Sequence, residues 1–392
     1  MKSDFVIRKM VLGCFLLFPV FCTGLERNTR RDESSNTEEL KAMQERETWF
    51  ISPELAADIR TEDTILLDAR HYALYSVSHI SGASSISWKE FARENSGLLL
   101  QSDELKRKLK EYGIDANGLI LVYGGSKNGW GEEGRITWML RTLGYPAYVV
   151  DGGFEGLHPL LKVTYGPLEG QPDSLPTTHD SPALDAIFQR ADSLTVTKDE
   201  LNELRNRPGI ILIDSRKKEE YLGATPYGES RGGHIPGAVH IYYQDLIRED
   251  GRILSASELA ELLLSREAIR AALKNQKLDG APGKRSAKNS SAHESPSDKR
   301  GALPGEISKD RKDVLPERHP KHRKDGLSDE LRNLVFITYC TGGVRSAFVT
   351  AVLRHYGLQA RNYPGSMWEW SAQPKVEFPL TLELAPGEMQ YE

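Results

Sequence analysis

Short apolar runs alternate with longer amphipathic stretches along most of the chain. This pattern predicts strands connected by helices. Residues 334–357, LVFITYCTGGVRSAFVTAVLRHYG, show it clearly, because a β-branched and aromatic run is followed by a helical repeat. One face of that repeat carries Val344, Phe348, Ala351, Val352 and Tyr356. We therefore expect a strand that ends at Cys340 and a helix that begins near residues 343–345.

The same order of segments occurs twice in the chain. The first copy consists of ILLDAR (65–70), HISGA (79–83), LILVYGG (119–125) and LRTLGYPAYVVDGG (140–153). The second consists of ILIDSR (211–216), HIPGA (234–238), LVFITYCTGG (334–343) and LRHYGLQARNYPGS (353–366). A long internal repeat of strand and helix signals predicts an α/β fold with two similar domains. In each, we expect a mostly parallel sheet with helices on both faces.

The domain boundaries follow from changes in composition. We expect domains over 48–165 and 192–378, joined by a linker, 166–191, that is rich in Pro, Gly and Thr. The second domain is interrupted by 274–325, which has no aromatic residue, five prolines, and 14 Lys or Arg against 8 Asp or Glu. Such a segment cannot bury enough apolar surface to fold, so we expect a disordered basic insertion.

The first 24 residues predict a signal peptide. Lys2, Arg8 and Lys9 precede an apolar stretch over 10–22, which is too short for a bilayer span of about 20 residues. An uncleaved anchor or a lipid-modified cysteine remains an alternative. A periplasmic or secreted protein is expected, and after cleavage it would keep Cys340 alone of three cysteines. The net charge of −5 favours no nucleic-acid partner, and we expect no stable membrane association beyond the signal segment.

The segment Cys340-Thr-Gly-Gly-Val-Arg345-Ser has the composition of a reactive loop. A thiol at a helix N-terminus lies in a positive field that lowers its pKa. Two glycines allow the backbone N–H groups to turn inward and form an anion cradle. Arg345 adds a guanidinium suited to an oxyanion. Nucleophile and anion site thus belong to one loop, while a buried structural cysteine is the alternative interpretation.

These features together resemble the tandem-domain rhodaneses, sulfurtransferases of the thiosulfate or 3-mercaptopyruvate type. The resemblance rests on the Asp-x-Arg strand ends, HIPGA, the Cys340 loop and ARNYPGSMWEW (360–370). It implies catalysis through a Cys340 persulfide, without a metal or organic cofactor. The expected substrate-binding residues are Thr341, Gly342, Gly343, Val344, Arg345, Arg216 and Arg231. The expected supporting residues are Asp214, Glu220 and His234.

The resemblance also separates the two halves. Gly124 stands where the second half has Cys340, so the first half is expected to be an inactive partner domain that walls off the site. Asp68 and His79 match residues that, in the mercaptopyruvate branch, act with a serine two residues after the cysteine. That position is Gly342 here, so we expect both to be structural.

The donor stays open at this point. The loop is similar to the Cys-x-x-Gly-x-Arg loops of bacterial rhodaneses that use thiosulfate, which makes thiosulfate the favoured donor and cyanide or another thiophile the acceptor. Glu220 replaces an expected substrate-binding arginine. The alternatives are a 3-mercaptopyruvate sulfurtransferase, a non-catalytic sulfur carrier, and a phosphatase, whose loop would be one residue longer. The expected partners are small sulfur donors and acceptors, with a protein thiol as a further acceptor.

Overall fold

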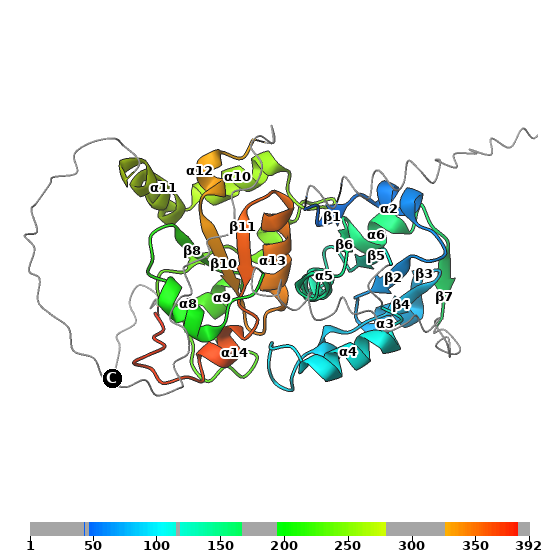
Figure 1. The fold of residues 1–392 in the computed structure, drawn as a ribbon, viewed down its shortest axis with the longest axis horizontal. Coiled ribbons are helices and arrows are strands. Elements are labelled where there is room, and N and C mark those ends of the chain that lie inside the picture. The colour runs from blue at the N-terminus through cyan, green and yellow to red at the C-terminus, as the bar shows by residue number, and fades with distance from the viewer. Residues whose placement is uncertain (1–42, 44–46, 115–117, 167–193, 280–325, 383–392) are drawn as a thin grey trace, which may run out of the picture.

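The computed structural model describes residues 43, 47–114, 118–166, 194–279 and 326–382. Two parallel sheets lie side by side, one in each half of the chain (Figure 1). In spatial order, the first sheet contains β1 (Phe50–Ile51), β6 (Ala147–Val150), β5 (Ile120–Tyr123), β2 (Ile65–Asp68) and β4 (Ala83–Ser85). The second contains β11 (Gln359–Asn362), β10 (Val335–Tyr339), β8 (Ile210–Asp214) and β9 (Val239–His240). A small antiparallel pair joins β3 (Ser78–Ile80) and β7 (Val163–Tyr165).

Helices follow the strands in both halves. Those of the first half are α2 (Pro53–Ile59), α3 (Tyr72–Val77), α4 (Ser102–Glu111), α5 (Glu132–Thr142) and α6 (Gly153–Leu157), with a 3₁₀ turn over Trp88–Phe91. Those of the second are α8 (Lys198–Leu204), α9 (Lys218–Leu222), α10 (Ala256–Ser265), α11 (Glu267–Asp279), α12 (Asp329–Arg332), α13 (Val344–His355) and α14 (Ser366–Trp370), with a 3₁₀ turn over Tyr243–Leu246. Among the residues that the structure describes, no helix is long and apolar enough to cross a membrane.

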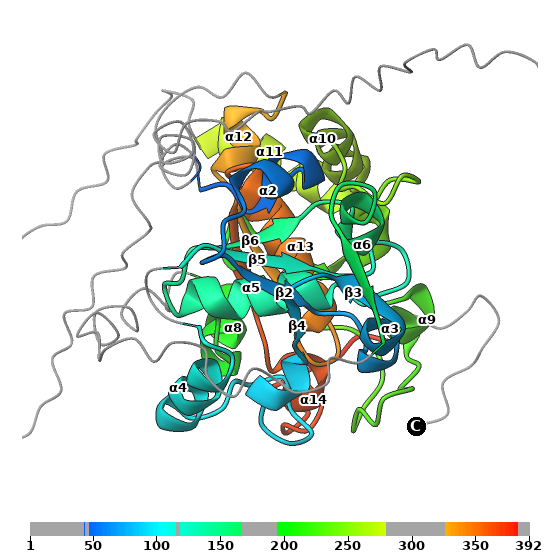
Figure 2. The same ribbon diagram turned by 90° about the vertical axis from the view of Figure 1, so that its right-hand side faces the viewer.

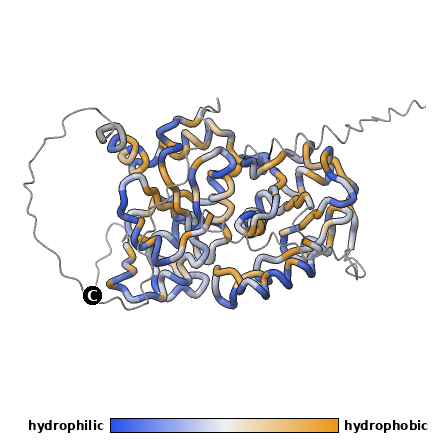
Figure 3. Tube along the Cα trace, viewed as in Figure 1, coloured by the Kyte–Doolittle hydropathy of each residue, from blue (hydrophilic) through white to orange (hydrophobic). Residues whose placement is uncertain are grey.

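Each sheet is covered on both faces, as the fold class predicts. Alternate strand residues face opposite sides, so Leu66 packs with α2 and α6 while Leu67 joins the core between the halves. In the second half, α8 and α14 cover one face and α13 the other. The strands consist mostly of apolar residues, whereas apolar and polar positions alternate along α4 (Figure 3).

The two halves share one core, centred on α5 and α13. These helices lie side by side between the two sheets, as both views show (Figures 1 and 2). Their backbones come very close at Gly134, where a Cβ atom would lie 2.5 Å from Cα of Phe348. The apolar core cluster around them includes residues of both halves. The position of α5 against the second domain is therefore set by direct packing.

The internal repeat extends to individual contacts. Asp68 pairs with Arg70, and Asp214 with Arg216, through nearly identical hydrogen bonds of 2.6–3.2 Å. His79 stacks on Tyr75, at 4.0 Å between ring centroids, just as His234 stacks on Tyr221 at 3.8 Å. Asp68 and His79 thus brace a strand end and a turn, the structural role expected for them.

The boundaries need one correction. Helix α11 continues to Asp279, six residues into the segment that was expected to lack regular structure from 274. The reason is that no glycine or proline interrupts the sequence until Gly280. The rest of that segment, the expected signal peptide over 1–24 and the expected linker apart from Gly166 lie outside the described residues.

Candidate active site

The Cys340 loop lies at the carboxyl edge of the second sheet, as its sequence predicts. Strand β10 ends at Tyr339, and α13 begins at Val344, with Gly343 as its N-cap residue in the left-handed conformation (φ 76°). A side chain would be strained there, and its Cβ would lie 2.6 Å from the carbonyl oxygen of Pro364. Gly343 therefore makes the tight turn that places the sulfur beside the N-terminus of α13.

The sulfur of Cys340 receives donors from its own loop and helix. The Gly343 N–H donates to Sγ at 3.1 Å, and the Ser346 hydroxyl lies 3.6 Å from it. The thiol is 1% exposed. Burial alone raises the pKa of Cys340, but the Arg345 charge and hydrogen bonds from Ser346 and Gly342 outweigh it, so the pKa lies below its ordinary value. The site thus holds a buried thiol whose thiolate form is stabilised by its surroundings.

The guanidinium of Arg345 already has hydrogen-bond partners within the protein. It forms two 2.7 Å hydrogen bonds with the Glu220 carboxylate and a third, at 2.8 Å, with the Thr341 hydroxyl. Burial raises the pKa of Glu220, but the charge and hydrogen bonds of Arg345 and the hydrogen bond of Thr341 lower it by more, so the net shift is downward. The Thr341 hydroxyl also lies 3.1 Å from Glu229 Oε1. Two carboxylates therefore flank the loop where a cationic anchor was expected.

Two of the expected substrate-binding arginines have other partners. Arg216 is fully buried, pairs with Asp214 and donates to the Gly233 carbonyl at 2.7 Å. Arg231 donates to four carbonyl oxygens, those of Ser371, Trp370, Gln373 and Phe378. The guanidinium of Arg216 thus holds a strand end and that of Arg231 holds the C-terminal segment, and substrate binding by either residue stays a prediction. His234, predicted to support the loop, stacks on Tyr221.

Aromatic residues of the C-terminal signature divide between core and site. Trp370 is fully buried in the second domain's core. Trp368 is half-buried and packs on the cysteine loop, since a Cβ at Gly342 would lie 2.2 Å from its ring. Its Nε1 donates to the Tyr227 carbonyl at 2.9 Å, and Tyr227 meets Trp130 of the first half edge-on. Val344, the remaining predicted loop residue, is buried as the first residue of α13.

Several residues at the site were not predicted from the sequence. Arg135 of α5 reaches the loop from the other half and donates to the carbonyl of Gly343 at 3.4 Å. Asn362 accepts a 2.7 Å hydrogen bond from the Ser346 hydroxyl, and Ser366 accepts one from the N–H of Cys340. Ser346 follows Arg345 directly, so loop spacing could have found it. Asn362 and Ser366 belong to the signature ARNYPGSMWEW (360–370), but that motif does not say that they bond to the loop. Arg135 comes from the other half of the chain and belongs to no motif.

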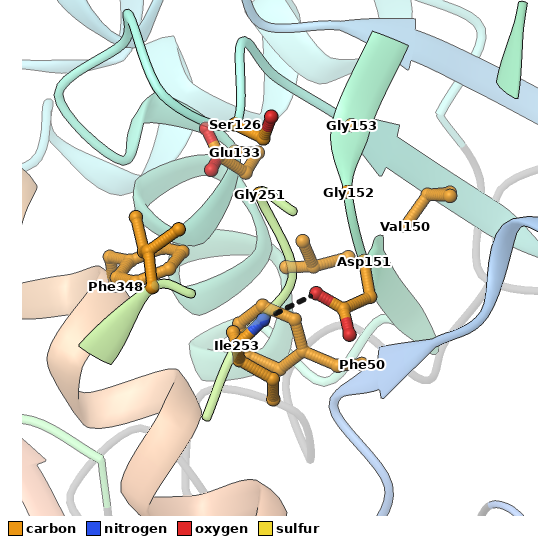
Figure 4. Close-up of a pocket in the computed structure, with 12 residues that line it drawn as sticks. Phe50, Ser126, Glu133, Val150, Asp151, Gly152, Gly153, Gly251, Ile253 and Phe348 are labelled. Atoms are coloured by element: carbon orange, nitrogen blue, oxygen red, sulfur yellow. Dashed lines mark hydrogen bonds between the residues drawn. The ribbon is translucent and has the colours of Figure 1, made fainter. Parts of the chain in front are cut away.

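The equivalent place in the first half is closed by a carboxyl group. Strand register matches Tyr123 with Asp68 as it matches Tyr339 with Asp214, so Gly124 is the structural counterpart of Cys340. A Cβ at Gly124 would lie 2.0 Å from Oε2 of Glu133. Glu133 stands two residues after the N-cap of α5, as Arg345 does in α13. It lines a small pocket between the halves (Figure 4).

Comparisons with known proteins agree with this architecture. The family described as Rhodanese-like domain matches residues 52–159 and 197–277, the second match ending before the Cys340 loop. The chain is 30% identical over 193 residues to a thiosulfate sulfurtransferase of Rattus norvegicus, covering 47% of this chain and 61% of that protein. It is 25% identical over 201 residues to the sulfur carrier protein TtuD of Thermus thermophilus, covering 48% and 67%.

Solved structures extend the likeness beyond those segments. The structure of 3-mercaptopyruvate sulfurtransferase from Leishmania major superposes with a TM-score of 0.53 at 21% identity, covering 83% of this chain and 74% of that one. The curated alignments span about two thirds of each relative's own length or less. The matched segments, the duplicated parallel sheets and the loop geometry place the protein in the rhodanese family, with two rhodanese-like domains in tandem.

Proposed function

We propose that the protein is a sulfurtransferase that carries sulfur as a persulfide on Cys340. The observation that carries this proposal is the thiol itself, which lies 3.1 Å from a loop N–H at the N-terminus of α13 and has a lowered pKa. A thiolate is the nucleophilic form of cysteine, and a sulfane sulfur is its natural electrophile. The similarity to thiosulfate and 3-mercaptopyruvate sulfurtransferases supports the same reaction class.

With thiosulfate as donor, the reaction has two balanced steps. The Cys340 thiolate attacks the outer sulfur, an S–S bond forms to Cys340, and sulfite leaves with the electron pair of the broken S–S bond. An acceptor such as cyanide then attacks the outer sulfur of the persulfide and leaves as thiocyanate, which restores the thiolate. The N–H of Gly343 would stabilise the anionic sulfur in both states.

Thiosulfate is the donor we favour, on the strength of the Cys-x-x-Gly-x-Arg spacing and the named relative. Arg345 is shared with Glu220, so a donor anion has to compete with that carboxylate for the guanidinium. We therefore expect a high KM for thiosulfate. The ratio of kcat/KM for thiosulfate to that for 3-mercaptopyruvate decides between the two donors.

Thiocyanate formation from thiosulfate and cyanide tests the proposal directly. The native chain should turn over, and Cys340→Ser should lose activity by at least about a thousandfold, because a hydroxyl forms no persulfide. Equal rates for the two proteins would refute the proposal. A sulfur carrier is the second candidate, favoured by the burial of Cys340, which shelters a stored sulfur. A carrier would gain the mass of one sulfur atom after thiosulfate treatment but would not turn over.

We also propose that the protein is exported and acts in the periplasm or outside the cell, because residues 1–24 have the composition of a signal peptide. Its substrates would then be small sulfur compounds of that compartment, and an exposed protein thiol is a further acceptor. The mass of the N-terminal peptide of the exported protein tests this, since cleavage before Leu25 is expected.

A further inference from the structure

The first domain sends a cationic side chain into the cysteine loop of the second. Arg135 lies on α5 and is 1% exposed. Its Nη2 donates to the carbonyl of Gly97 at 2.6 Å, and its Nη1 lies 3.4 Å from the carbonyl of Gly343. Its guanidinium carbon stands 4.7 Å from the ring of Trp138. These contacts connect the first domain to the residue whose N–H binds the sulfur.

The Gly97 turn is held equally close to the loop. A Cβ at Gly97 would lie 2.0 Å from the carbonyl oxygen of Pro364 and 2.4 Å from that of Gly342. At Gly343 a Cβ would lie 3.1 Å from Nη1 of Arg135. The guanidinium therefore occupies the junction of the two domains at the back of the cysteine loop.

The charge of Arg135 has no carboxylate partner among the described residues. Burial lowers the pKa of Arg135 to about 10, and the charge of Cys340 acts in the opposite direction. An isolated buried cation is costly unless an anion lies near it. Arg345 has the larger effect on the pKa of Cys340, but it is also paired with Glu220. Arg345 is thus ion-paired directly, whereas Arg135 forms no ion pair among the described residues.

We propose that Arg135 is a positioning residue of the active site, through which the cysteine-less domain holds Gly343 in place and offsets the negative charge of the Cys340 thiolate and its persulfide. The charged groups around the thiol are Arg345 from α13, Glu220 from α9, Glu229 from the following loop and Arg135 from α5. The two guanidinium groups balance the two carboxylates. Without Arg135 the thiolate would form beside one excess negative charge.

The test measures the thiol directly, in the full chain and without a sulfur substrate. The alkylation rate of the Cys340 peptide by iodoacetamide is followed by mass spectrometry from pH 5 to pH 10 in the native protein and in Arg135→Met. We expect the apparent pKa of Cys340 to rise by about one unit in the variant, so that alkylation at neutral pH slows about tenfold. The plateau rate at high pH should be unchanged.

Arg141→Met is the matched control. Arg141 lies on the same helix, is half-buried, packs on the rings of Trp49 and Tyr148, and donates to the carbonyls of Ala147 and Thr48. Its loss should lower stability as much as the loss of Arg135 but leave the thiol titration unchanged. Equal titration curves for Arg135→Met and the native protein would overturn the proposal.

Two further variants keep the proposal testable if the methionine variant does not fold. Arg135→Gln keeps a donor for the Gly97 carbonyl without the charge and should also raise the pKa of Cys340. Arg135→Lys keeps the charge and should leave that pKa low; an ordinary thiol pKa in a folded lysine variant would contradict the proposal. The part of the inference that concerns the persulfide rests on the proposed function, whereas the part that concerns the thiolate does not. A shifted titration without thiocyanate turnover would refute the sulfurtransferase and leave the role of Arg135 intact.

Discussion

Glu133 is the counterpart in the first domain of Arg345 in the second. Its carboxyl group also fills the space beside Gly124, the counterpart of Cys340. Its carboxyl is 6% exposed, and Oε2 has no hydrogen-bond partner among the described atoms. Burial, followed by the charges of Glu132 and Glu155, raises the pKa of Glu133 to about 8. A neutral carboxylic acid thus fills the space that a cysteine at Gly124 would need. The first domain cannot regain a nucleophile by one substitution at that position.

This raised pKa makes a prediction about stability. An unfolded Glu133 ionises near its ordinary value of about 4.5, whereas the folded residue keeps its proton up to about pH 8. The folded state therefore binds more protons between these values, and the free energy of unfolding should fall as pH rises from about 4.5 to about 8. Glu133→Gln should remove that decline and be more stable at pH 9 by a few kcal/mol, as about 1.4 kcal/mol per pKa unit implies.

Urea unfolding at pH 5, 7 and 9 measures the effect. Glu62→Gln, at an exposed turn, is the control and should follow the native protein at every pH. If Glu133→Gln and the native protein show the same pH dependence, the buried carboxyl is ionised in the folded state and its surroundings differ from those described.

At the scale of elements, Gly342 and Trp368 fix the shape of the loop. A Cβ at Gly342 would lie 2.2 Å from Cζ3 of the Trp368 ring, so the serine of the mercaptopyruvate branch does not fit. We expect Gly342→Ser to lower the free energy of unfolding by about 1–3 kcal/mol, the usual cost of overpacking. In a Trp368→Ala background the same serine should cost much less. A double-mutant cycle by urea unfolding measures this coupling, and additive effects would contradict the contact.

The elements themselves were largely predictable from the sequence. The strand before Cys340 and the start of α13 follow from a change in apolar period from two to 3.6, and both lie where that change places them. The loop residues Thr341 to Arg345 follow from their spacing to the cysteine. The sequence does not predict which group each charged side chain pairs with. Arg216 and Arg231 have the residue type of an anion site, and Glu220 stands where an arginine was expected, but the partners of all three are set by tertiary packing.

The same limit explains why Arg135 and Glu229 were missed. Each lies in a segment that has no sequence relation to the loop, and 208 positions separate Arg135 from Gly343. Local sequence patterns indicate which face of a helix is apolar. By that criterion Arg135 is only a polar residue in a largely apolar helix, and nothing marks it as part of the site. The domain packing that brings it to the cysteine is a property of the whole molecule.

For the whole molecule, the critical contact is the close approach of α5 to α13. Replacing an interior helical glycine by alanine normally stabilises a protein by about 1 kcal/mol. Gly134→Ala should do the opposite here, because its Cβ would lie 2.5 Å from Cα of Phe348, a backbone atom that a rotamer change cannot move. We expect the melting temperature to fall, and the alkylation of Cys340 at neutral pH to slow, since moving the domains apart withdraws Arg135 from the loop.

Gly125→Ala is the control for this substitution. Gly125 also lies in the first domain, but the nearest atom to its Cβ would be 3.7 Å away, an ordinary contact, so its variant should keep both the melting temperature and the thiol reactivity. A Gly134→Ala protein with a raised melting temperature would show that the two domains separate without cost. A lowered melting temperature with unchanged alkylation would mean that the packing of the domains and the reactivity of the thiol are independent. The expected result, a joint loss, would mean that the cysteine-less domain tunes the chemistry of its partner through one helix.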